Sequence, residues 1–400
     1  MGNLFKISGC GCALVDYLYN PVRFSGANFD RYKSVQAGDG GLSPGKLVFK
    51  EEFEKFSGED YLTVRDLITQ GKPPVTLNIG GPSIVSLIHA SQMLEGLPAE
   101  IHFYGSKGQD DGAAFIEEYL KRTPLKIGKY KISDKNTPFT EALSDPDYDQ
   151  GHGERIFINN IGAAWDLYPE DLDEAFYDSS ITVFGGSALV PHIHQSLLDL
   201  LKKAKAKQAV TIVNTVYDFL NELNNPGKAW PLGASLETYD YIDLLITDRE
   251  EALRLSDSET IEEALSFFKK TKVGAVIVTY GANPIHFFFN SRLFGVSEGQ
   301  RPVSEKVRNE IMQYPEKVGD TTGCGDNFVG GVIASLAKQL IERPDNIVNT
   351  EELIAFGTAS GGYACFYHGG TFYEEYPGQK RELITPYYLD HLLTLSNVTG

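Results

Sequence analysis

The chain has 400 residues and carries 36 Lys plus Arg against 54 Asp plus Glu, a formal net charge of -18. That sign argues against nucleic acid or an anionic membrane as the main partner. The length predicts one large α/β domain with an appendage, or two domains. We find no signal-peptide pattern and no apolar run near the roughly 20 residues of a membrane helix, so we expect a cytoplasmic protein.

The first part of the chain mixes short apolar runs with turn signals. Residues 5–15 read as one buried strand that ends at Asp16, and residues 20–60 are rich in Gly, Ser, Asp and aromatic side chains. A short strand over 75–79 ends at Gly80-Gly81-Pro82 and leads into a helix over 83–94. A strand over 101–104 precedes a helix over 112–120, whereas 125–160 shows short strand-like pieces without a long helical period.

From residue 160 onward, strands and helices alternate. The expected strands are 181–185, 209–214, 244–247 and 275–279, and the expected helices are 193–206, 249–255, 260–271 and 326–340. Such alternation predicts a mostly parallel sheet with helices on both faces.

Two of the four cysteines, Cys10 and Cys12, lie in the first apolar run. No further Cys or His ligands stand at metal-site spacing, so we expect small buried hydrophobic side chains and not a metal site. Cys324 could differ, because a thiol at a helix N-terminus tends towards greater reactivity, although it could also simply fill the position of a small residue.

The stretch Asp320-Thr321-Thr322-Gly323-Cys324-Gly325-Asp326 leads into a run of small apolar residues typical of a buried helix. Two glycines free the backbone, and the helix N-terminus offers unpaired N–H groups and the positive end of its dipole. Together they predict an anion site for a transferring phosphoryl group. A carboxylate at its mouth suits a base that accepts a proton from a substrate hydroxyl, although Asp326 could also simply cap the helix.

This stretch resembles the signature of the ribokinase-like (PfkB-type) carbohydrate and nucleoside kinases, with Cys324 in place of the usual Ala. Further segments resemble family motifs in the family order: Gly80-Gly81, residues 105–112, Gly153-Glu154-Arg155, residues 248–251 and residues 279–282. These segments span nearly the whole chain.

The resemblance implies roles for individual residues. Asp326 would be the catalytic base, and the backbone amides of Gly323, Cys324 and Gly325 would form the anion hole. Glu251 would hold Mg²⁺ through water, and a monovalent cation such as K⁺ would lie near Asp320 and Thr322. The ATP site would be lined by Asp248, Thr279 and Gly281.

The substrate side is less well defined by the resemblance. Asp16 matches the acidic residue that binds substrate hydroxyls, beside Gly80 and Gly81, while Arg155 is either a lid residue over the substrate or a solvated charge. Val85 stands where the family often has a sugar-binding Asn, and Asp248 replaces the usual Asn. Replacement contacts are expected from Asp39 and Asn214, with Asn28, Gly40, Gly41 and Asp218 as further candidates.

The fold class we expect is α/β, a three-layer sandwich with a central, mostly parallel sheet and a small β-sheet lid. Residues 1–16, 76–124 and 161–400 would form the nucleotide-binding core, and 17–75 and 125–160 the lid. Unpaired lid edges could form a homodimer.

The function we expect is ATP-dependent phosphorylation of a sugar hydroxyl. One alternative is a nucleoside kinase, because aromatic side chains over 17–32 could stack on a base, although they could equally pack the lid. Another is a sugar- or nucleotide-binding regulator without activity, against which the intact Asp326 and Glu251 weigh. A redox Rossmann enzyme is disfavoured because no G-x-G-x-x-G follows the first strand.

Overall fold

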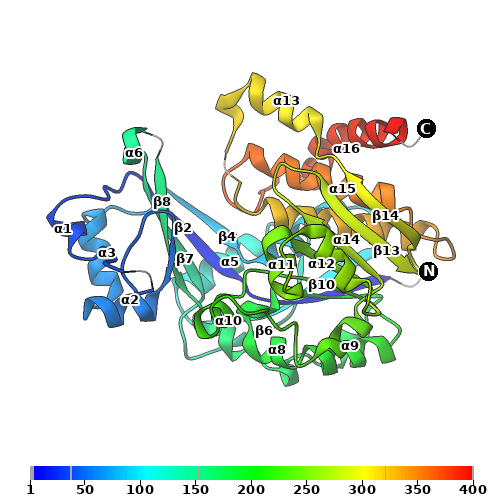
Figure 1. Ribbon diagram of the computed structural model, residues 1–400, viewed down its shortest axis with the longest axis horizontal. Helices are drawn as coiled ribbons and strands as arrows, with labels where there is room; N and C mark the ends of the chain where they lie inside the picture. Colours follow the sequence, from blue (N-terminus) through cyan, green and yellow to red (C-terminus); the bar gives the residue numbers. More distant parts are fainter. Residues whose placement is uncertain (1–3, 37, 152, 320, 399–400) are drawn as a thin grey trace.

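The computed structural model describes residues 4–36, 38–151, 153–319 and 321–398. Its larger sheet has nine strands in the order β14-β13-β12-β11-β10-β9-β1-β5-β6 (Figure 1). Seven neighbouring strands are parallel, and β13 and β14 form an antiparallel hairpin at one edge. The bounds are β1 Phe5–Gly11, β5 Ala99–Lys107, β6 Lys126–Ile132, β9 Ile181–Gly185, β10 Val210–Asn214, β11 Leu244–Asp248, β12 Ala275–Thr279, β13 Ile285–Ser291 and β14 Gly295–Arg301.

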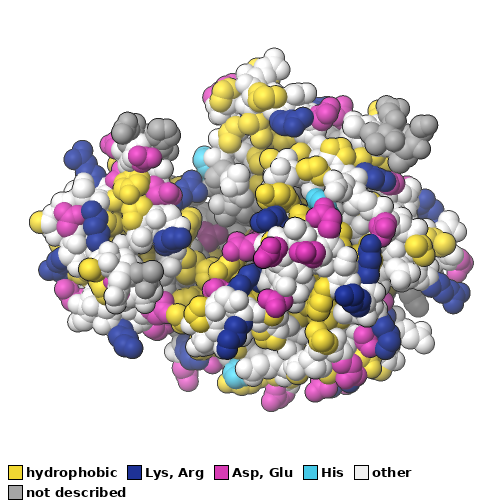
Figure 2. Space-filling model, viewed as in Figure 1, with side chains coloured by type: hydrophobic (Ala, Val, Ile, Leu, Met, Phe, Trp, Pro, Cys, Tyr) yellow, Lys and Arg dark blue, Asp and Glu magenta, His cyan; other side chains and the backbone are white. Residues whose placement is uncertain are grey.

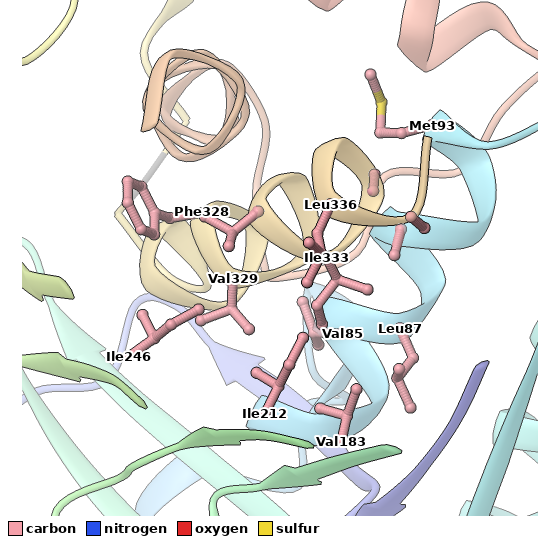
Figure 3. Packing of buried hydrophobic residues seen from close by; sticks show 14 of the residues in the cluster. Val85, Leu87, Met93, Val183, Ile212, Ile246, Phe328, Val329, Ile333 and Leu336 are labelled. Carbon is pink, nitrogen blue, oxygen red and sulfur yellow. The ribbon is translucent and has the colours of Figure 1, made fainter. Parts of the chain in front are cut away.

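Helices cover both faces of this sheet, which confirms the three-layer α/β prediction. Along β10, Ile212 belongs to the core cluster on one face and Val213 to the cluster on the other, as the two-residue period of a strand requires. Figure 3 shows the first face, where side chains of α4 and α14 pack onto the strands. The first face carries α4 Pro82–Met93, α14 Cys324–Glu342, α15 Thr350–Tyr363 and α16 Gln379–Val398, and the second carries α7 Glu174–Tyr177, α8 Pro191–Gln195, α9 Leu197–Ala206, α11 Arg249–Ser256 and α12 Ile261–Phe268.

The smaller sheet, which we call the lid sheet, has five strands in the order β3-β8-β7-β2-β4. It stands beside the core on the left of Figure 1, with three helices packed against it. The strands are β2 Leu14–Tyr19, β3 Leu47–Phe49, β4 Thr76–Gly80, β7 Phe139–Asp145 and β8 Glu154–Asn160, and the helices are α1 Ala27–Asp30, α2 Lys50–Ser57 and α3 Tyr61–Thr69.

The lid has a hydrophobic core of its own. Four of the five aromatic residues expected over 17–32 lie in it, with exposed fractions between 2% and 5%: Tyr19, Phe24, Phe29 and Tyr32. Their rings meet other lid aromatics, since Phe24 stacks on Phe29 and Tyr32 packs against Phe53. These four side chains therefore pack the lid, which is one of the two roles expected for them.

Three expectations about the strands were wrong. Residues 5–15 are not one strand, because the chain leaves the large sheet after Gly11 and enters the lid sheet at Leu14. Residues 76–80, placed in the core, pair with β2 in the lid sheet, and 126–132, placed in the lid, pair with β5 at the edge of the large sheet. In each case the partner strand, which local periodicity does not reveal, decides the sheet.

The remaining short elements connect these layers. They are α5 Asp111–Leu120, α6 Tyr148–Gly151, α10 Phe219–Asn224, α13 Glu305–Gln313 and the 3₁₀ turns η1 Gly162–Asp166, η2 Pro169–Asp171, η3 Ser187–Leu189, η4 Leu236–Tyr241, η5 Pro315–Lys317 and η6 Ala364–Phe366. Within the described residues, no helix is both long and apolar enough to cross a membrane.

Candidate active site

The N-terminus of α14 is built around a glycine. Gly323 is the N-cap with φ of 74°, and a Cβ there would lie 2.4 Å from the Cα of Gly370. Only a residue without a side chain can take this backbone conformation and this close contact. A Cβ on Gly325 would meet nothing within 4 Å, so space lies open over the first turn. The amide groups of this turn can therefore reach an anion.

Asp326 lies in the first turn of α14, at that open space. Burial raises the pKa of its carboxyl to about 6. A base works best when its pKa lies near the working pH, because it is then mostly ionised and still takes up a proton. The position and the pKa both suit a group that removes a proton from a hydroxyl.

Asp16 lies on β2 and its carboxylate fills the space above Gly80. A Cβ on Gly80 would lie 2.1 Å from Oδ2 of Asp16, so the missing side chain makes room for the carboxylate. In the register of the lid sheet, Asp16 pairs with Asn78. Gly81 follows as the N-cap of α4 with φ of 107°, and its Cβ would meet the carbonyl oxygen of Cys12 at 2.6 Å.

Asn78 links the strand that carries Asp16 to the loop that packs against the N-terminal turn of α14. Its side-chain amide donates to the carbonyl oxygen of His368 at 2.8 Å, and a Cβ on Gly369 would lie 2.1 Å from its Nδ2. The next residue, Gly370, is the one that touches Gly323. Residues some 300 positions apart in sequence thus meet, and Asp16 lies on the same side of the molecule as the first turn of α14.

A second acidic group lies at the carboxyl ends of β11 and β12. Glu251 is 8% exposed, and Oε2 accepts hydrogen bonds from the Thr215 hydroxyl, from the Thr247 hydroxyl at 3.4 Å and from the Asp248 backbone N–H at 3.1 Å. The pKa of Glu251 is raised to about 7, by burial and then by the charge of Asp248. Among the described residues every hydrogen bond to this side chain ends on Oε2, which leaves Oε1 for a ligand.

The neighbouring strand supplies the rest of this edge. Thr279 pairs with Asp248, and a Cβ on Gly281 would meet nothing within 4 Å. Tyr280 is 41% exposed, with the Arg249 guanidinium 5.1 Å from its ring centre. In Figure 2 acidic side chains gather over α11 beside the hollow that separates the lid from the core. An open turn with a nearby cation and ring suits a nucleotide.

Comparison with known proteins shows the family to which this chain belongs. A profile of the pfkB family of carbohydrate kinases matches residues 68–375. The chain belongs to the pfkB family of carbohydrate kinases. It is 30% identical over 269 residues to a fructokinase of Klebsiella pneumoniae, covering 66% of this chain and 78% of that protein. It is 24% identical over 282 residues to an adenosine kinase of Schizosaccharomyces pombe, covering 67% of this chain and 76% of that protein.

Solved structures of other kinases share the fold. A probable sugar kinase of Rhizobium etli superimposes with a TM-score of 0.67 at 18% identity, covering 96% of this chain and 99% of that one. Adenosine kinase of Schistosoma mansoni in complex with 2-fluoroadenosine gives 0.66 at 16% identity, covering 92% and 96%. A putative ribokinase II of E. coli in complex with ATP and Mg²⁺ gives 0.63 at 17%, covering 97% and 100%.

The sugar-binding Asn of many pfkB kinases has no counterpart at Val85. This side chain is 1% exposed and packs in the core between α4 and α14, as Figure 3 shows. A Cβ on Gly370 would lie 3.1 Å from it. Val85 therefore supports the loop at the anion hole from below, and the substrate contact must come from elsewhere.

The other predicted substrate residues are scattered. Asp39 lies in a lid loop, where its oxygens accept from the backbone N–H groups of Val35, Gln36 and Gly41, which hold its pKa low. Arg155 lies at the start of β8, where its backbone N–H donates to Oε1 of Glu154 at 2.8 Å. Neither is brought to Asp326 by a contact among the described residues, so their roles remain predictions.

Asn214 ends β10 and is 3% exposed. Its Oδ1 has no hydrogen-bond partner among the described residues. A buried oxygen without a partner is costly, which makes this a place for a ligand or water beside Glu251. Asp218 instead caps α10 by accepting from Asn221. Thr322 is exposed, and Asp320 lies outside the described residues.

Two residues beside the N-terminal turn of α14, Asn327 and Lys380, were missed from the sequence alone. Asn327, fully buried, donates from Nδ2 to the carbonyl oxygens of Gly323 and Gly370, each at 2.8 Å. Its Oδ1 accepts from the Lys380 ammonium at 2.8 Å and from the Tyr367 hydroxyl at 3.0 Å. The amide thus donates two hydrogen bonds and accepts two. A flipped amide would turn its NH₂ group towards the two donors and its oxygen towards the two carbonyl oxygens.

Lys380 is 1% exposed, and burial lowers its pKa to about 7. The folded protein therefore binds this proton less tightly than the unfolded chain does, so the free energy of unfolding should rise with pH between about 7 and 10. We expect the Lys380→Met variant to lack this rise. Its stability relative to that of the wild type should therefore be lower at pH 9 than at pH 6. Thermal melts at both pH values test this, with the exposed Lys338→Met on α14 as the control. An equal pH dependence in both variants would contradict the assignment.

The negative charge of Asp248 raises the pKa of Glu251, and removing that charge should lower this pKa again. Asn is as good an N-cap as Asp, so Asp248→Asn should keep α11 and lower the pKa of Glu251. We expect the Mg²⁺ concentration for half-maximal activity to increase when the wild type is taken from pH 8 to pH 6, and to increase less in the variant. Asp257→Asn at the other end of α11 is the control. An identical Mg²⁺ dependence at both pH values would contradict a role for Glu251 in binding Mg²⁺.

Proposed function

We propose that this pfkB kinase transfers the γ-phosphate of ATP to a hydroxyl of a sugar, with Asp326 as the base. The observation that carries the proposal is the contact chain from Asp16 through Asn78 to Gly370 and Gly323. It supports the proposal because it links the Asp16 carboxylate, which would hold substrate hydroxyls, to the N-terminal turn of α14, where the backbone amides and Asp326 lie. Phosphoryl transfer needs this kind of positioning more than covalent chemistry.

The residues divide the work as follows. Asp16 would bind and orient the sugar, and Asp326 would take the proton of the attacked hydroxyl. The amides of Gly323, Cys324 and Gly325 would stabilise charge on the phosphoryl oxygens. Asn214, Asp248, Thr279 and Gly281 would line the ATP side at the carboxyl ends of the strands, where ligands of open α/β sheets bind.

The oxygen donors at Glu251 and Asp248 fit a hard divalent cation. Mg²⁺ keeps several waters and takes one or two carboxylates plus phosphate oxygens. Within the described residues, no group of three or more His, Cys, Asp or Glu side chains is placed to hold a metal ion. When bound, Mg²⁺ would offset the charge of the phosphates. A requirement for K⁺ near Thr322 remains a prediction, tested by replacing K⁺ with tetramethylammonium in the assay.

A nucleoside is the second candidate substrate, and a cavity favours it. About 470 Å³ lies between the lid and the core, with three aromatic rings from β3, η1 and α10 in its wall. Part of its wall comes from Ala188 and Leu189, in the turn η3 that follows β9. The wall includes Phe49, Lys135, Ile161, Trp165, Leu189 and Phe219. Rings of this kind can stack on a base.

ADP release measured across ketohexoses, pentoses, sugar phosphates and nucleosides separates these candidates. We expect the highest kcat/KM with a sugar. A nucleoside with the highest value would replace the proposal by its alternative. If ATP binds and no compound is phosphorylated, the regulator interpretation takes its place.

We also propose a homodimer through the lid. Helices α1–α3 already cover part of the lid sheet, so the available region is the β4 edge, where Val75 and Leu77 are 59% and 36% exposed. An unpaired strand edge with apolar side chains is a natural pairing surface. Light scattering should give twice the chain mass, and Leu77→Lys should give the monomer mass. A monomer mass for the wild type would contradict this.

A further inference from the structure

Two cysteine thiols meet beside the anion hole. Cys324 is the first residue of α14, and Cys365 lies in η6, at the end of α15. Their Sγ atoms are 3.5 Å apart. Both residues are partly exposed, whereas Cys10 and Cys12 are 1% and 3% exposed. A reagent from solvent can therefore reach the first pair and not the second.

We propose that Cys324 and Cys365 form a thiol modification site, at which a two-electron thiol oxidant joins them in a disulfide that distorts the anion hole and stops phosphoryl transfer. This rests on the proposed function only where it concerns activity. The disulfide itself follows from the thiol geometry.

Forming the disulfide requires a small movement of the two sulfur atoms beside the N-terminal turn of α14. A disulfide has an S–S distance of about 2.05 Å, so the two sulfurs must approach each other by roughly 1.5 Å. Cys324 contributes one of the three amides of the anion hole, and the helices around it pack tightly. A Cβ on Gly361 of α15 would lie 2.9 Å from the Cys324 carbonyl oxygen. Displacing a catalytic group by about 1 Å costs roughly 10²-fold in rate.

The second thiol is tied to the other end of the same loop. The backbone N–H of Gly319, just ahead of the signature, donates to the carbonyl oxygen of Cys365 at 2.9 Å. A covalent link between Cys324 and Cys365 would therefore close a ring around residues 319–324. The positive end of the α14 dipole stabilises the thiolate of Cys324, which favours it as the attacking sulfur.

Diamide, an azo oxidant, serves as the probe because its reaction needs two thiols. The Cys324 thiolate adds to one nitrogen of the N=N bond, and the other nitrogen takes up a proton. The Cys365 thiolate then attacks the Cys324 sulfur, the S–N bond breaks, and the nitrogen leaves with a second proton as the hydrazine. Two thiols are oxidised to one disulfide and one N=N bond is reduced to HN–NH.

Peptide mapping and activity are measured on the same samples of the full chain. Trypsin should release residues 318–338 and 339–380, which contain Cys324 and Cys365 respectively. After diamide we expect these two peptides as a disulfide-linked pair that dithiothreitol separates. We expect activity to fall roughly 10²-fold and to return with dithiothreitol. Cys365→Ser should keep the activity of the untreated wild type and resist diamide, and Cys10→Ser should respond as the wild type does.

The outcomes that overturn the proposal are separate from those that overturn the kinase assignment. No linked peptide under conditions that fully oxidise glutathione would refute the thiol site. Linked peptide with full activity, or equal inhibition of Cys365→Ser, would refute its control of the anion hole. An untreated enzyme inactive on every sugar and nucleoside would count against the proposed function, while the linked peptide would still decide the thiol site.

Discussion

Asp326→Asn should abolish turnover while the protein stays folded. Asn cannot accept the proton of the attacked hydroxyl, so we expect kcat to fall roughly 10³-fold, within the usual range for general-base catalysis. ATP affinity, measured by calorimetry without the second substrate, should change by less than about twofold. Asp199→Asn, which removes an exposed carboxylate from the first turn of α9, is the matched control. Turnover within about tenfold of the wild type would refute the role of Asp326.

The same variant should be more stable at neutral pH. The pKa of Asp326 is raised to about 6 in the folded protein against 3.8 ordinarily, so the folded state favours the protonated form. Stability contributed by this group is present below pH 4 and is lost as the pH rises through 6. Asn mimics the protonated form, and we expect a gain on the order of 1–3 kcal/mol at pH 7. The activity of the wild type should fall as the pH drops below about 6, because the base becomes protonated.

Asp16→Asn and Gly80→Ala should both weaken sugar binding. The Asn variant loses the charge that is proposed to hold the hydroxyls, and the Ala variant places a Cβ 2.1 Å from Oδ2 of Asp16. Because that oxygen is the end of a flexible side chain, the carboxylate should move and the fold should survive. We expect kcat/KM for the sugar to fall roughly 10²-fold in each, as when a hydrogen-bonded buried charge loses its partner.

A double-mutant cycle makes this test sharper. If Gly80→Ala acts only by moving the carboxylate of Asp16, it should cost much less when it is combined with Asp16→Asn, since effects on one shared interaction do not add. The KM for ATP should stay within about twofold in both single variants and in the double variant, which serves as the internal control. Additive losses would show that Gly80 acts independently of Asp16.

Prediction from the sequence was most successful where the residues of a motif lie close together in the chain. The signature at 320–326 brings glycines, a carboxylate and the start of a helix within a few residues, so the N-terminal turn of α14 with Asp326 in it could be predicted, while its role as an anion hole stays a prediction. Asp16 could be matched only through the family resemblance, because the expected strand over 5–15 ends before it, whereas the structure places Asp16 within β2. By contrast, Asn78 and Lys380 act through partners some 290 and 53 positions away. A single Asn or Lys has no periodic or spacing signal, and only the fold reveals what it contacts.

The sheet boundaries show the same limit. The run from 5 to 15 is mostly apolar because both of its halves are largely buried, yet the halves belong to different sheets. The strand over 126–132 is polar and largely exposed because it lies at an edge of the large sheet, and its sequence therefore resembles that of a lid strand. Strand pairing depends on contacts between distant segments, which composition does not encode.

The aromatic core of the lid has a consequence for the energetics of substrate capture. Rings from 19–61 pack with Leu143, Ile156 and Ile158 inside the lid itself. The lid therefore does not need the substrate or the core domain in order to hold its shape. Any closure over the crevice would proceed as the movement of an already ordered body, and would not spend binding energy on ordering a loop. More of the sugar's binding energy would remain for the transition state.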